Sequence, residues 1–223
     1  MKKKYYYIVL FILIAVFYLK DIDFKNLFYK DIEKIENPAD LLVLVNKNYQ
    51  LDENYVPSNL FKLDTKYSND NQYLKLEAKL AFEKLSKKAL KDGYKIVGVS
   101  TYRSYDYQKK LFKDYVLEKG EEYALNCSAK EGHSEHQTGL AIDVMGSNSD
   151  YDGFEDSKEF LWMRENAHKY GFIMRYPLGK EHITGYKYEP WHYRFVGVDV
   201  ASIVYENDLT LEEFYYSYIK KQI

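Results

Sequence analysis

The chain has 223 residues, of which 30% are charged, and its formal net charge at pH 7 is −2. This length is enough for one catalytic domain with a short appendage. The near-neutral charge and the lack of zinc-finger spacing or arginine-rich patches argue against a nucleic-acid partner. The single cysteine, Cys127, excludes an intramolecular disulfide and leaves the cellular compartment open.

The first twenty residues have the pattern of a membrane-targeting segment. Three lysines at positions 2 to 4 precede an uncharged apolar run from Tyr5 to Leu19. As a helix this run would span roughly 22 Å of the ~30 Å hydrocarbon core, and its flanking tyrosines and Lys20 could reach the interfaces. No A-x-A-like cleavage site follows, so we expect an uncleaved single-pass anchor over residues 1–20, with the rest of the chain outside the cell membrane. Cleavage would instead give a secreted protein.

The remaining chain is predicted to form a stalk and one domain. Residues 21–37 are charged with scattered aromatics, which is typical of a stalk or short helix, and the domain would occupy residues 38–223. The β-rich apolar run Leu41–Val45 predicts a strand. Residues 49–72 contain Pro57 and many asparagines, aspartates and serines, and predict a long surface loop.

Apolar residues at helical spacing predict an amphipathic helix that Gly93 terminates. Its apolar stripe consists of Leu74, Ala78, Ala81, Leu85 and Ala89. Three further helices are predicted from capping residues at their starts. The caps are Ser104 for a helix to about Glu118, Ser157 for a helix that Gly171 ends, and Thr210 with Glu213 for a C-terminal helix; the first of these helices carries Tyr107, Leu111 and Tyr115 on one face.

Four apolar segments predict strands between these helices. They are Tyr94–Ser100, Gly139–Met145, Phe172–Tyr176 and Trp191–Val196. The helices and strands do not follow a βαβ rhythm. The sequence therefore predicts an α+β fold, with a central, largely antiparallel sheet flanked by helices and preceded by the N-terminal membrane helix.

The segment from Ser134 to Asp143 carries the first candidate site residues. In a strand, Leu140, Ile142 and Val144 would face a core, while Gly139, Ala141 and Asp143 would face the other way. The two small residues leave room beside the carboxylate for a metal and a substrate backbone. His136 precedes Gly139, where a turn can swing its imidazole over the same pocket.

A second cluster, Glu189-Pro190-Trp191-His192, follows about fifty residues later. In a regular strand Glu189 and His192 would face opposite sides, so a bend at Pro190 is needed to bring both to one metal. Together with the first cluster it supplies two imidazoles, one carboxylate ligand and one spare carboxylate. These are the parts of a catalytic zinc site with an open position for water and a general base.

The motifs SEHQTGLAID (134–143) and EPWHYR (189–194) resemble the zinc D-alanyl-D-alanine carboxypeptidases of the VanY type. That family belongs to the wider lysostaphin, D-Ala-D-Ala peptidase and hedgehog fold group. The resemblance extends over about residues 38–200 and includes STYRSY (100–105), Gln108, RYP (175–177) and TGY (184–186). One departure is Glu131, where relatives often have proline before the Gly-x-Ser-Glu-His segment.

The resemblance implies the role of each site residue. Zinc would be held by His136, Asp143 and His192, with Glu189 as the general base. Arg103 would polarise the scissile carbonyl or hold the terminal carboxylate of the substrate. The other substrate contacts that the resemblance implies are Ser134 and Gln108, and Lys180 could also pair the terminal carboxylate.

The expected function is hydrolysis of the C-terminal D-alanine from peptidoglycan stem peptides by metal-activated water, in a monomeric cell-wall hydrolase. An L,D-carboxypeptidase or a wall endopeptidase would use the same zinc chemistry. The motifs do not separate these activities, because leaving-group specificity depends on the loops at residues 146–156 and 177–188. A third alternative is a catalytically inactive, zinc-binding wall-interaction module, which is disfavoured by the presence of both Glu189 and Arg103.

Overall fold

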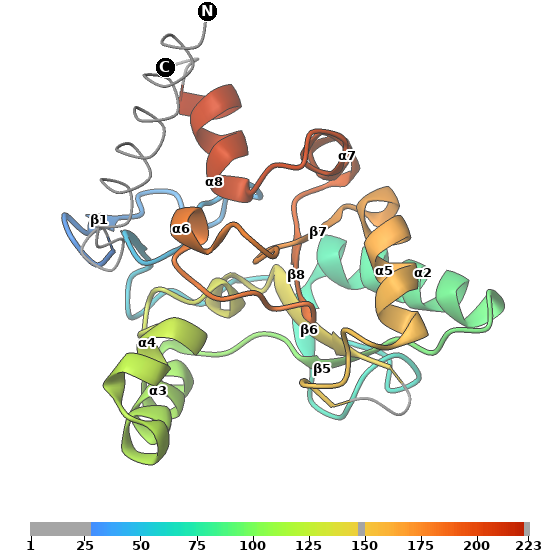
Figure 1. Cartoon of the computed structure of the whole chain (residues 1–223), viewed down its shortest axis with the longest axis horizontal. Helices are drawn as coiled ribbons and strands as arrows, with labels where there is room; N and C mark the ends of the chain where they lie inside the picture. The colour runs from blue at the N-terminus through green and yellow to red at the C-terminus, as the bar shows by residue number, and fades with distance from the viewer. Residues whose placement is uncertain (1–27, 147–149, 221–223) are drawn as a thin grey trace, which may run out of the picture.

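The structure is a computed structural model that describes residues 28–146 and 150–220 (Figure 1). The predicted anchor at residues 1–20 and the first part of the predicted stalk lie outside the described residues. Within the described ranges, no helix combines the length and the apolar character needed to cross a bilayer.

The centre of the fold is a four-stranded sheet in which every neighbouring pair is antiparallel. Its order is β5 (Val97–Ser100), β6 (Ala141–Met145), β8 (His192–Phe195) and β7 (Phe172–Met174). The predicted α+β class with an antiparallel central sheet is confirmed. All four strands are shorter than predicted at one or both ends, and β6 starts at Ala141 because Gly139 belongs to the preceding turn.

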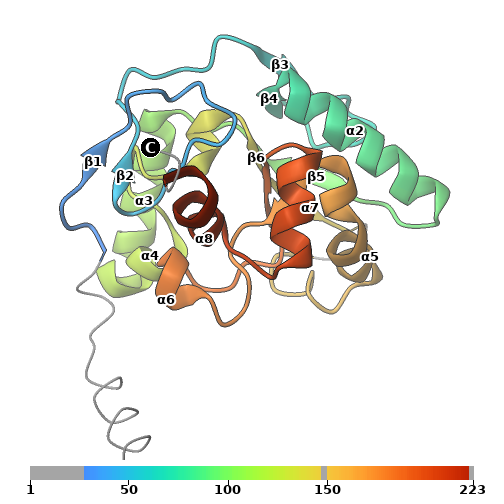
Figure 2. The same ribbon diagram turned by 90° about the horizontal axis from the view of Figure 1, so that it is seen from above.

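Helices flank the sheet on both sides, as predicted. Figures 1 and 2 agree in placing α2, α5 and α7 at one side of the sheet and α3 and α4 at the other. The helices are α2 (Leu76–Lys91), α3 (Tyr105–Lys119), α4 (Glu121–Cys127), α5 (Lys158–Asn166), α6 (Glu181–Thr184), α7 (Val198–Glu206) and α8 (Leu211–Phe214). Single helical turns at Glu135–Thr138, Ala167–Tyr170 and Tyr215–Ile219 complete the helices of the described residues.

The two faces of the sheet have different environments. Leu140, Ile142 and Val144 are fully buried and pack with Phe82 of α2 and Met163 of α5 in the main hydrophobic core. The strand alternation predicted for this segment is therefore confirmed for the core face. The opposite face is left for polar side chains, and the candidate site lies there.

The predicted helix caps are all present. The Ser104 hydroxyl accepts a hydrogen bond from the Tyr107 amide at 3.2 Å, and the Ser157 hydroxyl accepts one from the Phe160 amide at 3.0 Å. At α8, Thr210 and Glu213 form the complete reciprocal capping box. Helices α4, α6 and α7 were not predicted, and α2 begins two residues later than expected.

Replacing Thr210 with alanine should lower the free energy of unfolding by about 1 kcal/mol, because the first turn of α8 loses its side-chain cap. The hydroxyl is buried and accepts from the Glu213 amide at 3.1 Å. Denaturant unfolding would measure the change. As a control, Ser202→Ala removes a hydroxyl that only bonds the Val198 carbonyl of its own helix, and should change stability by less than about 0.5 kcal/mol. Equal stability of the two variants would contradict the cap.

The prediction of a strand at Leu41–Val45 is wrong. Leu41 and Leu42 lie in a turn that the Val43 amide closes on the Asp40 carbonyl at 3.3 Å. The side chains of Val43, Leu44 and Val45 are buried, but the segment pairs with no strand in the described part of the chain. The guanidinium of Arg194 takes the place of a partner strand, since its Nη2 donates to the carbonyls of Leu41 and Val43, each at 2.9 Å. The apolar pattern of a segment does not tell whether its backbone carbonyls accept hydrogen bonds from a neighbouring strand or from a side chain.

Short strand pairs surround the central sheet. The region predicted as one long loop contains β2 (Tyr49–Gln50) and β3 (Leu60–Lys62), which pair with β1 (Glu33–Lys34) and β4 (Tyr73–Lys75). The β1–β2 pair and the bond from the Tyr29 amide to the Asn48 side chain hold the later part of the predicted stalk against the domain. The domain boundary at residue 38 stays a prediction.

Candidate active site

Asp143 and His192 are directly opposite each other on the adjacent strands β6 and β8. Directly opposed residues of an antiparallel pair project from the same face, so the two side chains meet over the polar face of the sheet. Asp143 Oδ1 lies 3.1 Å from His192 Nδ1 and 3.4 Å from His136 Nε2. One ligand atom from each of the three buried residues lies within 4.8 Å of the others, a grouping that could hold a metal ion.

His136 reaches this cluster from the turn Glu135–Thr138, as the sequence predicted. Its Nδ1 lies 2.6 Å from the Thr101 carbonyl oxygen, which can only accept, so Nδ1 donates and Nε2 is left to face Asp143. Gly139 ends the turn with φ +68°, and a Cβ there would lie 2.7 Å from the Leu60 side chain. Glycine is thus required by the turn and by Leu60, and the expectation that Gly139 makes room for a metal on a strand is wrong.

Glu189 stands beside the cluster because the chain bends where predicted. The His192 amide donates to the Glu189 carbonyl at 3.1 Å, closing a turn over Pro190 and Trp191. This turn brings Glu189 Oε2 within 3.7 Å of His192 Nδ1. Burial raises the pKa of the Glu189 carboxyl to about 7, with Asp143 adding to the rise and with His192 and Arg103 opposing it. A carboxyl with such a pKa can both take and return a proton near neutral pH.

The three clustered side chains have electrostatic properties suited to a cation. Burial and the nearby Arg103 together lower the pKa of His136 to about 4, although Asp143 opposes them, so this imidazole is neutral at pH 7. Burial alone would raise the pKa of Asp143, but the two imidazoles more than offset this and keep the carboxylate ionised. His192 has its pKa raised to about 9 against the effect of burial, because Asp143 and Glu135 favour its charged form. A metal ion would displace that proton.

The donor set fits zinc. His136 Nε2 and Asp143 Oδ1 are buried and have no hydrogen-bond partner among the described residues, although buried polar atoms are normally paired. Two imidazoles and one carboxylate are the three-ligand set of catalytic zinc sites, which keep a further position for water or substrate. The unpaired atoms converge on a common point, as a metal centre requires.

A cavity of about 680 Å³ opens over the cluster. The predicted substrate residues Arg103, Gln108 and Ser134 all line it. The Arg103 Nε and the Gln108 Oε1 atoms are buried and have no hydrogen-bond partner in residues 28–146 and 150–220. The amide nitrogen of Gln108 donates to the Ala129 carbonyl at 2.7 Å, which leaves its oxygen without a partner. Both residues therefore bring a polar atom to the cavity wall that lacks the hydrogen bond such buried atoms normally make.

Aromatic side chains form much of the remaining cavity wall. Tyr107, Leu111 and Tyr115, which periodicity predicted as one face of α3, line the cavity instead of packing in a core. Tyr107 is 59% exposed. Helical spacing identified the face correctly and could not tell a cavity wall from a core. The wall also includes Tyr151 and Trp191, whose rings meet edge to face at 5.2 Å.

Lys180 does not take part in the site, contrary to the expectation that it could pair a substrate carboxylate. Its ammonium lies 3.2 Å from Glu213 Oε2, at the start of α8. His133 also lies apart from the cluster, since its Nδ1 is 2.8 Å from the Asn46 carbonyl oxygen. Of the basic residues that line the cavity, Arg103 is the one for which the sequence predicted a contact with the substrate.

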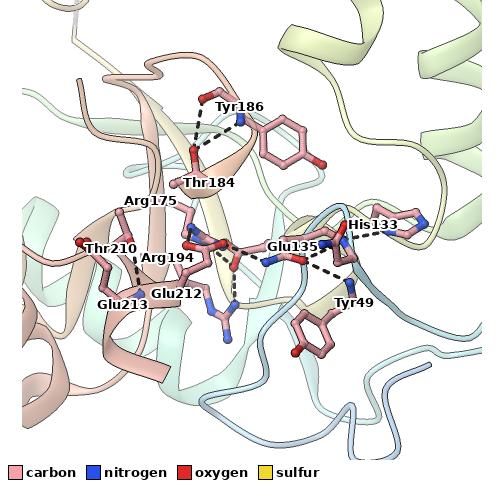
Figure 3. A network of polar contacts seen from close by, with 12 residues as sticks. Tyr49, His133, Glu135, Arg175, Thr184, Tyr186, Arg194, Thr210, Glu212 and Glu213 are labelled. Carbon is pink, nitrogen blue, oxygen red and sulfur yellow. Dashed lines mark hydrogen bonds and ion pairs between the residues drawn. The ribbon is translucent and has the colours of Figure 1, made fainter. Parts of the chain in front are cut away.

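The sequence assigned no role to Glu135, which the structure places at the centre of a buried ionic network (Figure 3). Its Oε1 accepts from Arg175 Nε and from Arg194 Nη1, both at 2.8 Å. Arg175 also forms a two-bond pair with Glu212 of α8, at 2.8 and 2.6 Å. The sequence did hold one indication of a buried charge network beside the site. Arg194 lies two residues after His192 and therefore shares its face of β8.

The VanY family, described as D-alanyl-D-alanine carboxypeptidase, matches residues 71–198. The chain belongs to this family. The family prediction made from the motifs is thus confirmed, and with it the prediction of a carboxypeptidase. The chain is also 45% identical over 197 residues to YodJ of Bacillus subtilis (strain 168), which is named as a carboxypeptidase; the alignment covers 85% of this chain and 72% of YodJ.

Solved structures of VanY-like peptidases share the fold. The LdcB LD-carboxypeptidase superposes with a TM-score of 0.78 at 44% identity, covering 84% of this chain and 91% of that one. A mutant of the vancomycin-resistance D,D-pentapeptidase VanY from a VanB-type cassette, in complex with Zn(II), gives 0.68 at 30% identity and covers 78% and 97% of the two chains. The expected likeness of the fold to D,D-peptidases is therefore confirmed.

Proposed function

We propose that this protein is a zinc D-alanyl-D-alanine carboxypeptidase that removes the C-terminal D-alanine from peptidoglycan stem peptides. The observation that carries the proposal is the convergence of His136, Asp143 and His192 beneath a cavity that also holds Glu189 and Arg103. The three clustered residues would hold the zinc. The zinc complex of the related VanY structure supports this choice of metal.

In the proposed mechanism, zinc held by His136, Asp143 and His192 would supply Lewis-acid activation of a water molecule and of the scissile carbonyl. Glu189 takes the proton of the attacking water and returns it to the amine of the departing D-alanine. The raised pKa of its buried carboxyl suits both transfers. Glu189 is thus assigned as the general base and general acid.

Arg103 is assigned to the negative charge of the substrate, either on the carbonyl oxygen as it reacts or on the terminal carboxylate. Its buried, unpaired Nε atom lies at the cavity wall, where a carboxylate partner would compensate for its loss of water. Gln108 can accept from a substrate amide through its unpaired Oε1, and Ser134 offers a hydroxyl to the substrate from the segment before His136.

An L,D-carboxypeptidase acting on tetrapeptides is the second candidate, favoured by the likeness to the LdcB LD-carboxypeptidase. Incubation with muropeptide pentapeptide and tetrapeptide, with and without a chelator, separates the two by mass analysis. We expect D-alanine release from the pentapeptide only, lost with chelator and restored by zinc. Release from the tetrapeptide only would establish the second candidate instead. A zinc-loaded protein that cleaves neither would be a wall endopeptidase or a binding module.

We also propose that the protein is a monomer anchored in the cell membrane by residues 1–20, with its domain facing the wall. The lysine-flanked apolar run and a wall peptide as substrate support this location. Mass spectrometry of the membrane fraction should find the uncleaved chain. A mature form in the medium that lacks about the first 25 residues would show secretion instead.

A further inference from the structure

We infer that Glu135 is a positioning residue that fixes which nitrogen of His192 faces the metal. The inference rests on the proposed zinc site and adds a residue to it that the sequence motifs left without a role. It is carried by the contacts of Glu135 within the buried network that Figure 3 shows.

The contact between Glu135 and His192 joins two otherwise unpaired atoms. Glu135 Oε2 and His192 Nε2 lie 3.7 Å apart, and both side chains are buried. Neither atom has a hydrogen-bond partner elsewhere in the described part of the chain. Leaving a buried donor and acceptor unpaired is costly, and a small closing movement would join these two. Since a carboxylate can only accept, the proton of the neutral imidazole belongs on Nε2.

The other ring nitrogen of His192 faces the cluster. Nδ1 lies 3.1 Å from Asp143 Oδ1 and 3.7 Å from Glu189 Oε2. His136 is arranged in the opposite sense, with Nδ1 held by the Thr101 carbonyl and Nε2 turned to the cluster. Each imidazole therefore presents a different nitrogen, and each has its own partner for the remaining N–H, as metal-ligating histidines generally do.

Two arginines hold the Glu135 carboxylate in place. Arg175 and Arg194 both donate to its Oε1, at 2.8 Å each, which leaves Oε2 for His192. Arg175 is held in turn by Glu212, and Arg194 by the carbonyls of Leu41 and Val43. With two guanidinium groups and two carboxylates the network is neutral, so Glu135 can be buried as an anion without an excess charge.

Ring packing is the competing explanation for the orientation of His192. The ring of Tyr176 lies 4.8 Å from the His192 ring, and the His136 ring lies 4.9 Å away. If packing alone held the imidazole, removing the negative charge of Glu135 would change protein stability without changing zinc affinity. The two explanations therefore predict different zinc affinities, which can be measured without an activity assay.

Zinc titration of the full chain in detergent tests the inference, with E135Q compared against E212Q. Both variants remove one carboxylate from the same arginine network, but Glu212 does not face His192. We expect the zinc dissociation constant to rise about 10-fold in E135Q, in the range found for partners of metal-bound histidines, and to stay within about 3-fold of wild type in E212Q. Equal zinc affinities of E135Q and wild type would overturn the inference.

Nitrogen-15 NMR of the histidine rings in the zinc-loaded wild-type protein gives a second test that needs no variant. We expect a proton on Nε2 of His192, protected from exchange, and zinc on Nδ1. Zinc on Nε2 would overturn the inference even if E135Q failed to fold. A wild-type protein that binds no zinc would instead overturn the proposed metal site itself, so the two failures are distinguishable.

Discussion

Replacing Glu189 with glutamine should leave zinc bound and reduce kcat for D-alanine release by about 10³-fold, within the range for loss of a general acid–base group. Glutamine has nearly the same shape but cannot take the proton of the attacking water. The turn that places residue 189 uses its backbone carbonyl and amide, which bond the His192 amide and the Tyr176 carbonyl, so it should survive the change. Turnover and zinc content, measured on one preparation, would separate chemistry from metal loss.

Measuring KM beside kcat separates a loss of chemistry from a loss of substrate binding. Because Glu189 acts on the proton in the reaction step, kcat should fall far more than substrate binding weakens. A zinc-loaded variant that keeps more than about a tenth of wild-type kcat would contradict the assignment of Glu189 as the base. Loss of zinc from the variant would point to Glu189 as a ligand instead.

Replacing His136 with alanine should abolish turnover and raise the zinc dissociation constant by more than about 100-fold. This exceeds the loss of affinity expected when only a hydrogen-bond partner of a zinc ligand is removed. Only Asp143 and His192 would remain of the clustered donors, and two ligands hold zinc poorly. Metal analysis after dialysis, together with turnover at saturating zinc, would measure both effects. Backbone changes should be small, since the turn at Glu135–Thr138 is closed by backbone bonds and by Thr138.

His133→Ala provides the matched control for this prediction. His133 is also a buried imidazole, three residues earlier in the chain, but its Nδ1 is bonded to the Asn46 carbonyl and it is not part of the cluster. The control variant should lose some stability and keep its zinc. If both variants lost zinc to the same degree, the loss would reflect general disturbance of the segment and not removal of a ligand.

The sequence was sufficient to predict the clustered residues because their geometry follows from local rules. Strand alternation placed Asp143 on the face opposite Leu140 and Ile142, and the spacing of Glu189 and His192 required a bend at Pro190 if both were to meet one metal. Capping residues marked the starts of α3, α5 and α8. Each of these features depends on residues close together in the chain.

Other features depend on distant residues and were not predictable in the same way. Leu41–Val45 has the composition of a strand, but its Leu41 and Val43 carbonyls are bonded by the guanidinium of Arg194, about 150 residues later. Tyr107 and Tyr115 have the spacing of a core stripe, but they line the cavity instead. Glu135 is informative only once Arg175 and Arg194 are known to meet at one of its oxygens.

The opposed pairing of Asp143 and His192 makes strand alignment part of the chemistry. A slip of β8 by one residue along β6 would exchange its two faces, turning Tyr193 toward the cavity and burying His192 in the core. Such a misaligned sheet could keep most of its backbone bonds and still have no metal centre. Since only the correct alignment assembles the three ligands, zinc would favour that alignment over its neighbours, and the metal would help to select the fold that uses it.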